Sequence, residues 1–171
     1  MNSASLCIAL LLVAPEATVA DDEALHISLP MKGLKMADIH DTFDEAREGG
    51  RKHGATDIVA PRGTPVLAVN DGKIVKLFLS KPGGITVYQF DPSEKYCYYY
   101  AHLDRYAPGI AEGTIVHRGE TVAFVGSTGN ANPANPHLHF EIHRLEPDRH
   151  WYQGTSINPY SYLVNALRSA E

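Results

Sequence analysis

The chain has 171 residues and a formal net charge of −5, from 15 Lys and Arg against 20 Asp and Glu. At this length a single domain can bury roughly 70% of its unfolded surface, so a core can form without a structural metal. The basic residues form no block, which excludes the electrostatic footprint of a nucleic-acid-binding protein. We therefore expect no nucleic-acid partner.

The first residues have the pattern of a secretory signal. An apolar run at 6–13 is followed by Pro15 and by the small residues Thr18-Val19-Ala20, so we predict a signal peptide over residues 1–20. The alternative is a buried N-terminal strand. The run is shorter than the roughly 20 apolar residues that span a bilayer, so we expect no stable membrane insertion after cleavage. The mature protein is then periplasmic or secreted.

The rest of the chain divides into an N-terminal approach segment at 21–48 and one functional domain at 49–171. Within the approach segment, residues 24–30 are strand-like. Residues 31–50 mix charges with glycines, as a surface segment does. No internal repeat or low-complexity linker divides the chain further.

From residue 57 onward, short apolar runs alternate with turn residues rich in Gly, Pro, Asn and Asp. This spacing predicts an all-β fold, mainly an antiparallel sheet that forms a sandwich or a barrel-like structure. One short C-terminal helix is expected at 159–168, with Asn158 as its N-cap and Pro159 at its first position. Strands are expected at 58–60, 66–69, 74–79, 85–90, 96–103, 121–125 and 137–143.

The last of these runs contains His137-Leu138-His139. Side chains two apart on a strand point to the same face, so the two imidazoles are expected to lie side by side and offer a metal-binding edge. His143 lies one step further along the same face. As a fourth protein ligand it would close the metal site, so we favour a satisfied core or surface residue.

His53 and Asp57 form a second candidate pair. In an extended strand their backbones would lie about 13 Å apart, so a shared metal requires the chain to curl between them. Gly49, Gly50 and Gly54 permit such a curl at little cost in backbone strain. Alone this pair is more simply a surface pair, but combined with the histidine-bearing strand it offers two imidazoles and a carboxylate, donors of the kind that zinc binds.

The third candidate is the run Tyr96 to Leu103. Strict alternation places Tyr98, Tyr100 and His102 on one face of the strand. That face would be aromatic with polar tips and would end in an imidazole. Without the other two candidates, an ordinary packed sheet edge would be the better explanation.

Together, His53-x-x-x-Asp57, Tyr-Ala-His-Leu ending at Leu103, and Pro-His-Leu-His-Phe-Glu at 136–141 resemble the lysostaphin-type zinc metalloendopeptidases. These enzymes have LytM-like catalytic domains and cut peptide bonds in bacterial peptidoglycan. One departure is Ala55, where the family usually has glycine. The resemblance runs from about residue 41 to 163 and includes the segments 60–66, 71–75, 126–130 and 157–159.

The resemblance implies a zinc endopeptidase domain at 49–171 with peptidoglycan stem or cross-bridge peptides as substrate and other cell-wall enzymes as further candidate partners. It implies Zn²⁺ as the cofactor and these roles: His53, Asp57 and His139 as metal ligands, His102 and His137 as catalytic residues.

The chemistry of the residues agrees with this set. Three protein ligands leave the fourth position of zinc open, and a zinc-activated water then needs a general acid/base, for which histidine is suited. The zincin motif His-Glu-x-x-His is absent from the sequence, so we look for the base at His137 or His102. Tyr98 and Tyr100 are expected to wall the substrate groove.

Two other classes of function stay open. A non-catalytic wall-binding or regulatory module would modulate other wall hydrolases, and such relatives have typically lost ligand positions. A zinc-stabilised structural domain would leave five polar site residues poorly explained. Zinc stoichiometry distinguishes the regulatory module from the other two classes.

Overall fold

The computed structural model describes residues 25–170, so the predicted signal peptide lies outside the described residues. The described chain forms nine strands, one α-helix and two short 3₁₀ helices. The elements are η2 Met36–Asp38, η3 Glu48–Gly50, β1 Thr56–Val59, β2 Pro65–Leu67, β3 Gly72–Ser80, β4 Gly84–Phe90, β5 Tyr96–Tyr106, β6 Ile115–Val116, β7 Thr121–Val125, β8 His137–Arg144, β9 Thr155–Ile157 and α1 Tyr160–Arg168.

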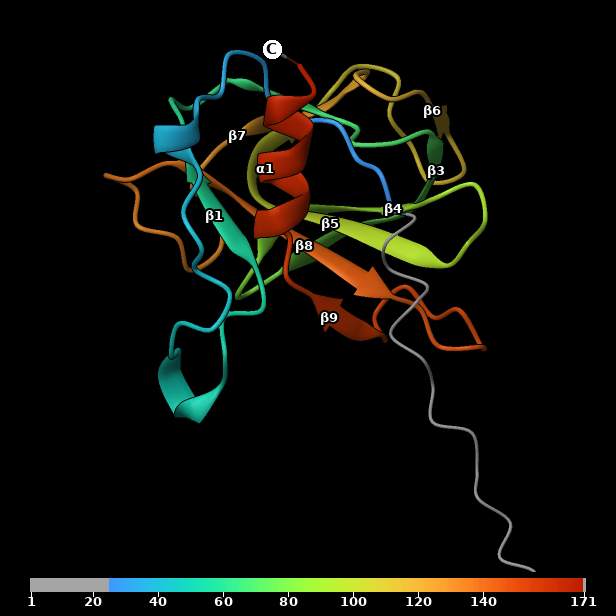
Figure 1. Cartoon of the computed structure of the whole chain (residues 1–171). Helices are drawn as coiled ribbons and strands as arrows, with labels where there is room; N and C mark the ends of the chain where they lie inside the picture. The colour runs from blue at the N-terminus through green and yellow to red at the C-terminus, as the bar shows by residue number, and fades with distance from the viewer. Residues whose placement is uncertain (1–24, 171) are drawn as a thin grey trace, which may run out of the picture.

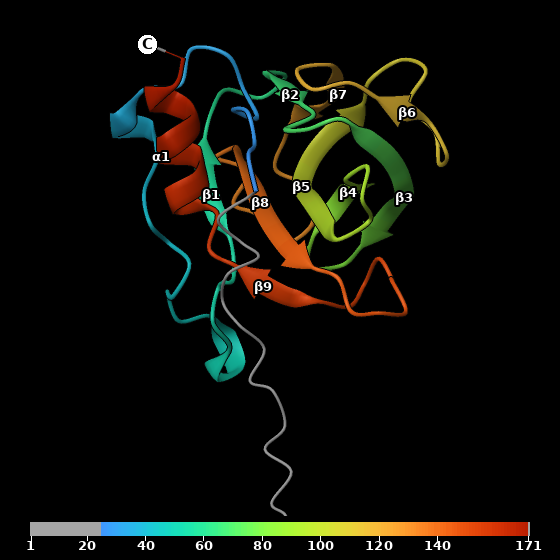
Figure 2. The same cartoon turned by 45° about the vertical axis from the view of Figure 1, so that its right-hand side comes forward.

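The strands pair into one antiparallel sheet with the order β1-β8-β5-β4-β3-β6. Strand β7 pairs with both β2 and β5, and β9 pairs with β8. Figures 1 and 2 show the sheet curling strongly, with β3, β4 and β5 wrapped around one another and α1 lying beside β1. The expected all-β fold with a short C-terminal helix is confirmed.

Alternation along β8 explains how the sheet builds a core and a site at once. Leu138, Phe140 and Ile142 are fully buried, whereas the residues between them are partly exposed on the opposite face. Leu163 and Leu167 of α1 join the same core. All seven expected strands form, while the two short strands β6 and β9 lack an apolar run long enough to reveal them.

The N-terminal segment packs more closely than its sequence indicates. Residues 25–30 are not a strand, although Ser28 N–H donates to the carbonyl of Val69 at 2.7 Å. Met31 and Ile39, expected in a surface segment, are buried in the core. Isolated apolar residues in a charged segment gave no periodic signal of this burial.

No helix within residues 25–170 is both long enough and apolar enough to cross a membrane.

A substitution at Gly84 tests how tightly the loop after β7 packs against the start of β4. Its φ is +65°, and a Cβ atom there would overlap the backbone of Thr128 and Gly129. We expect Gly84→Ala to lower the free energy of unfolding by about 2–3 kcal/mol, since backbone strain and overlap act together. Urea denaturation measures this.

The matched control is Gly63→Ala, because Gly63 has φ +84° but open space around the position of a Cβ atom. Strain alone should cost about 1–2 kcal/mol there. Equal losses in the two variants would show that the loop moves away freely.

Candidate metal centre and active site

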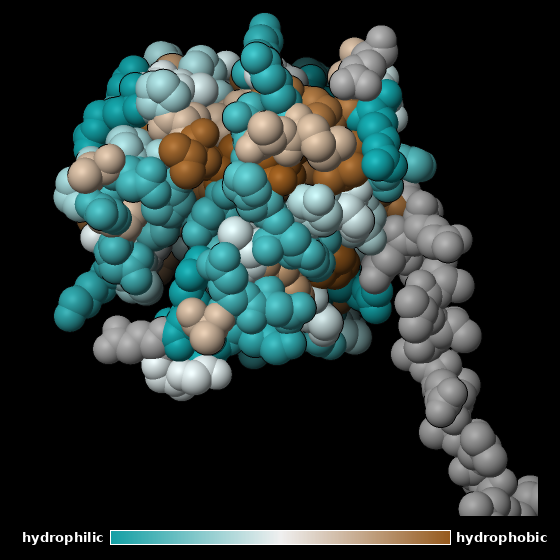
Figure 3. Space-filling model, turned by 60° about the vertical axis from the view of Figure 1, so that its left-hand side comes forward, coloured by the Kyte–Doolittle hydropathy of each residue, from teal (hydrophilic) through white to brown (hydrophobic). Residues whose placement is uncertain are grey.

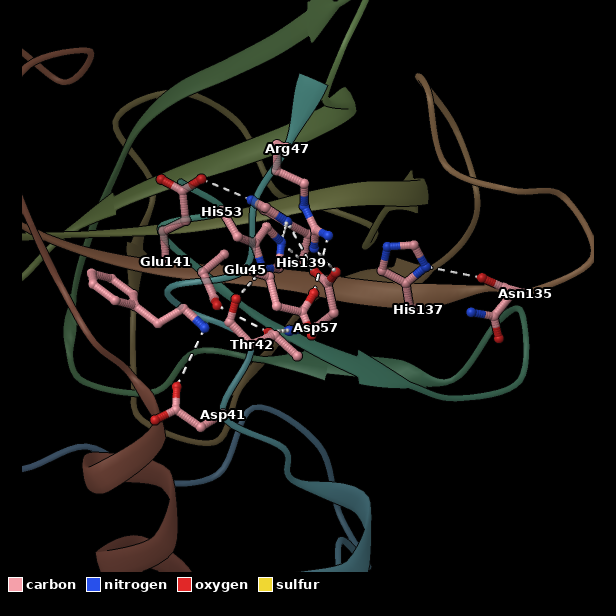
Figure 4. Close-up of polar contacts among 12 residues, drawn as sticks. Asp41, Thr42, Glu45, Arg47, His53, Asp57, Asn135, His137, His139 and Glu141 are labelled. Carbon is pink, nitrogen blue, oxygen red and sulfur yellow. Dashed lines mark hydrogen bonds and ion pairs between the residues drawn. The ribbon is translucent and has the colours of Figure 1, made fainter. Parts of the chain in front are cut away.

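Three side chains converge on one point beside β1 and β8 (Figure 4). Nε2 of His53, Nδ1 of His139 and Oδ1 of Asp57 are mutually 3.0 Å apart. Among the described residues these form the one group of His, Cys, Asp and Glu side chains arranged to hold a metal ion. The three residues expected as ligands are therefore brought together.

Strand register and a tight curl produce this triangle. Asp57 on β1 lies directly opposite His139 on β8. Gly54 adopts φ +74°, which turns the chain so that His53 points back to the same place. Nδ1–H of His53 donates to the carbonyl of Thr42 at 3.0 Å, which leaves Nε2 as the inward-facing lone pair.

The triangle fits a zinc ion. Tetrahedral zinc with bonds of about 2.0–2.1 Å separates neighbouring ligand atoms by about 3.3 Å, close to the 3.0 Å sides found here. Two imidazole nitrogens and one carboxylate oxygen are a donor set that zinc accepts, and three protein ligands leave one position open.

Electrostatics favour a charged Asp57. Burial alone would raise the pKa of its carboxyl, but hydrogen bonds and charges from His139 and His53 outweigh burial and hold the pKa well below its usual range. The Arg47 guanidinium also lies 3.1 Å from Oδ2, so it fixes the carboxylate with Oδ1 turned to the imidazoles. Asp57 is therefore an anion ready to bind a cation.

Glu141 holds the other side of the His139 ring. Its Oε1 lies 2.7 Å from Nε2 of His139, and its Oε2 lies 2.5 Å from Nε2 of His143. Burial raises the pKa of Glu141, yet the two imidazoles bring that pKa down to about 2. His143 thus faces Glu141 and lies outside the ligand triangle.

We expect Glu141→Gln to weaken zinc binding, because a carboxylate behind a ligating imidazole orients the ring and raises its basicity. The dissociation constant should rise roughly 10–100-fold, measured by competition with a chromophoric chelator. Glu146→Gln is the matched control, since Glu146 is exposed beyond the end of β8. An unchanged affinity in Glu141→Gln would exclude this supporting role.

His102 and His137 stand next to the triangle. Their ring centroids are 4.9 Å apart, and the His102 ring lies 5.5 Å from that of His139. Nδ1–H of His102 donates to the carbonyl of Thr128, and Nδ1–H of His137 to that of Asn135, each at 2.9 Å. Both rings therefore keep Nε2 free as a proton acceptor.

His102 is the more constrained of the two. It is one of three non-glycine residues in the described chain with positive φ, at +58°, a strained conformation that clusters at functional sites. Burial lowers the pKa of its imidazole to about 4, so His102 is neutral at pH 7. Its ring is thus fixed in position, tautomer and charge.

The two tyrosines expected on the groove wall lie elsewhere, which corrects that expectation. Tyr98 and Tyr100 are fully buried in the core, where their hydroxyls bond Asn70 and Gln89. Strict alternation fails because the positive φ of His102 brings its side chain to the face of Tyr99.

The five polar residues line an open pocket of about 550 Å³. Three cations that the sequence analysis missed also line it: Arg47, Arg51 and Lys52. Arg51 and Lys52 directly precede His53, which was a visible signal, although nothing in the sequence placed the three side chains toward the ligands. The further lining residues are Pro82, Gly83, Tyr99, Ala101, Asn130, Ala131, Asn132 and Glu141.

Fold and site together define a small antiparallel β protein with a His₂Asp group that could hold a metal ion and two further histidines at an open pocket. The family model described as Peptidase family M23 matches residues 51–159, which contain all five of these residues. This chain belongs to peptidase family M23.

Two curated relatives illustrate the similarity. The L-Ala--D-Glu endopeptidase of Bacillus subtilis is 34% identical over 129 residues, which cover 71% of this chain and 38% of that protein. The murein hydrolase activator NlpD of Escherichia coli is 32% identical over 118 residues, covering 69% and 27%. The chain thus spans well under half the length of these relatives.

Solved structures of peptidases have a similar fold. The catalytic domain of the antimicrobial peptidase lysostaphin from Staphylococcus simulans superposes with a TM-score of 0.63 at 27% identity, covering 74% of this chain and 91% of that one. A zinc-containing peptidase from Vibrio cholerae gives 0.56 at 26% identity, covering 69% and 36%.

Proposed function

We propose that this protein is a zinc-dependent endopeptidase that cleaves peptide bonds in bacterial peptidoglycan. One observation carries the proposal. Three ligand atoms that leave one coordination position open lie at the same pocket as two further histidines, whose rings are fixed by hydrogen bonds to backbone carbonyls. A structural metal site would need neither the open side nor the two histidines. Family membership and the endopeptidase relative support the reaction class.

His53, Asp57 and His139 would hold the metal. When bound there, zinc would supply Lewis acidity that polarises a peptide carbonyl and makes water more acidic near neutral pH. Asp57 contributes a negative charge and the two imidazoles bind through their lone pairs. Glu141 keeps the ring of His139 turned toward the site.

His102 and His137 would move the proton. Peptide hydrolysis by water requires a base to take a proton and an acid to protonate the leaving amine. The free Nε2 atoms of His102 and His137 can each accept a proton. Because burial disfavours a charge on His102, the transferred proton should reside on His137, the more exposed ring, and return from it to the amine.

The setting follows from the substrate. Peptidoglycan lies outside the cytoplasmic membrane, so the enzyme would act in the periplasm or outside the cell after removal of residues 1–20. Residues 49–171 would form the catalytic domain, and the preceding segment would support it through the packing of Met31 and Ile39.

The test is mass spectrometry of fragments released from purified, cross-linked peptidoglycan. We expect zinc-loaded protein to release peptide fragments whose masses identify one bond, chelated protein to release none, and added zinc to restore release. Release that persists after complete chelation would contradict a zinc enzyme.

A regulatory role is the second candidate, because one relative is named as a hydrolase activator. The retained triangle and both pocket histidines favour the enzyme instead. A zinc-loaded, folded protein that releases no fragment yet stimulates a second wall hydrolase would establish the regulatory role.

A further inference from the structure

One wall of the pocket carries three positive charges, of which only that of Arg47 contacts a residue of the ligand triangle. The segment 45–53 supplies Arg47, Arg51 and Lys52 to this wall. The protein as a whole has a net charge of −5, so these cations do not reflect a basic protein. Figure 3 shows predominantly hydrophilic surface over the lower part of the molecule, where η3 of this segment lies in Figure 1.

The carboxylates of the pocket are already engaged. Asp57 contacts His53 and His139, while Glu141 contacts His139 and His143. These two carboxylates therefore cannot neutralise all three cations, Arg47, Arg51 and Lys52.

The three cations differ in their partners. Lys52 pairs with Asp44 at 2.6 Å, and both side chains are at least 70% exposed. Arg47 reaches Glu45 and Asp57, each at 3.1 Å, and is drawn toward the metal centre in Figure 4. The guanidinium of Arg51 has no hydrogen-bond or ion-pair partner within residues 25–170, although the backbone carbonyl of Arg51 accepts from N–H of Arg47. One guanidinium at the mouth of the pocket is thus uncompensated.

We propose that Arg51 binds a free carboxylate of the substrate beside the scissile bond, with Arg47 adding positive potential next to it. The substrate class is a peptide with an ionised carboxyl group flanking the bond that is cut. This inference rests on the proposed function, because it assigns the substrate of that same site.

The chemistry of arginine suits this task. A guanidinium offers paired N–H donors that match the two oxygens of a carboxylate, and such charge-assisted bonds are stronger than neutral ones. Arg47 is held between two carboxylates and cannot turn outward without breaking both contacts. Arg51 is therefore the direct contact, and a carboxamide in place of the carboxylate would lose the charge.

The experiment compares two synthetic stem peptides that contain L-Ala-D-Glu and differ only in one group: the α-carboxyl of D-Glu is free in one and amidated in the other. Calorimetry measures their dissociation constants with zinc-loaded His137→Ala protein, in which turnover should be slow enough for binding to be measured. Arg51→Gln is then added to this background, and Lys52→Gln is the matched control.

We expect the free acid to bind about tenfold more tightly than the amide, as one charge-assisted hydrogen-bonded pair provides. Arg51→Gln should remove this preference by weakening only the acid, while Lys52→Gln should keep it. Equal binding of acid and amide, or a preference that survives Arg51→Gln, would overturn the proposal.

Turnover of peptidoglycan by the zinc-loaded wild-type protein separates the two claims. Turnover without an Arg51-dependent preference removes the carboxylate site and leaves the endopeptidase. An Arg51-dependent preference without turnover removes the endopeptidase and leaves a carboxylate-binding pocket.

Discussion

A His53→Ala variant is expected to lose both its zinc and its hydrolytic activity. The substitution removes one of the three ligands, and the remaining His139 and Asp57 are too few to hold zinc tightly. Affinity for zinc should fall by more than the roughly 10–100-fold that loss of a supporting partner causes. Metal content after dialysis, measured by mass spectrometry, and release of peptidoglycan fragments are the two readouts.

The control for this variant is His117→Ala, because the side chain of His117 is 81% exposed and lies outside the pocket. It should keep one zinc per chain and full activity. Full zinc content in His53→Ala would mean that the metal sits elsewhere, and full activity without zinc would remove the metal from the reaction.

The second large effect is expected at the two pocket histidines. His137→Ala should keep zinc bound but lower kcat by roughly 10²–10⁴-fold, the usual contribution of general acid/base catalysis. His137 does not belong to the ligand triangle, and its ring is held by the carbonyl of Asn135 instead. Metal content and initial rates on the same preparation separate binding from chemistry.

His102→Ala should behave similarly, with one added effect. The backbone strain at φ +58° persists in this variant, because alanine, like histidine, is unfavourable in the left-handed region. A His102→Gly variant should therefore be more stable than His102→Ala while equally inactive. Wild-type rates in either the His102 or the His137 variants would remove that residue from catalysis.

The strand histidines show how far sequence reasoning reaches. Alternation in His137-Leu138-His139 correctly separated the pocket face from the core face of β8. The resemblance to lysostaphin-type enzymes supplied the pairing of these histidines with His53 and Asp57, which spacing alone could not. The 3.0 Å triangle then depends on the register of β1 against β8, a non-local property.

The tyrosines show where that reasoning stops. Counting by twos from His102 placed Tyr98 and Tyr100 in the groove, but a non-glycine residue with positive φ interrupts the alternation. Sequence does not reveal such a residue, since histidine is uncommon in this conformation. The orientation of Arg47 toward Asp57 was equally hidden, because it depends on the curl of the segment before β1.

The most direct test of the central claim counts the bonds that the protein breaks. Purified peptidoglycan is incubated with zinc-loaded protein, and new amino groups and new sugar reducing ends are quantified in parallel. We predict that amino groups appear with time, that reducing ends stay at the level of the buffer control, and that chelation stops the increase. Reducing ends without amino groups, or no new amino groups from a folded protein that holds one zinc per chain, would contradict a peptidoglycan endopeptidase.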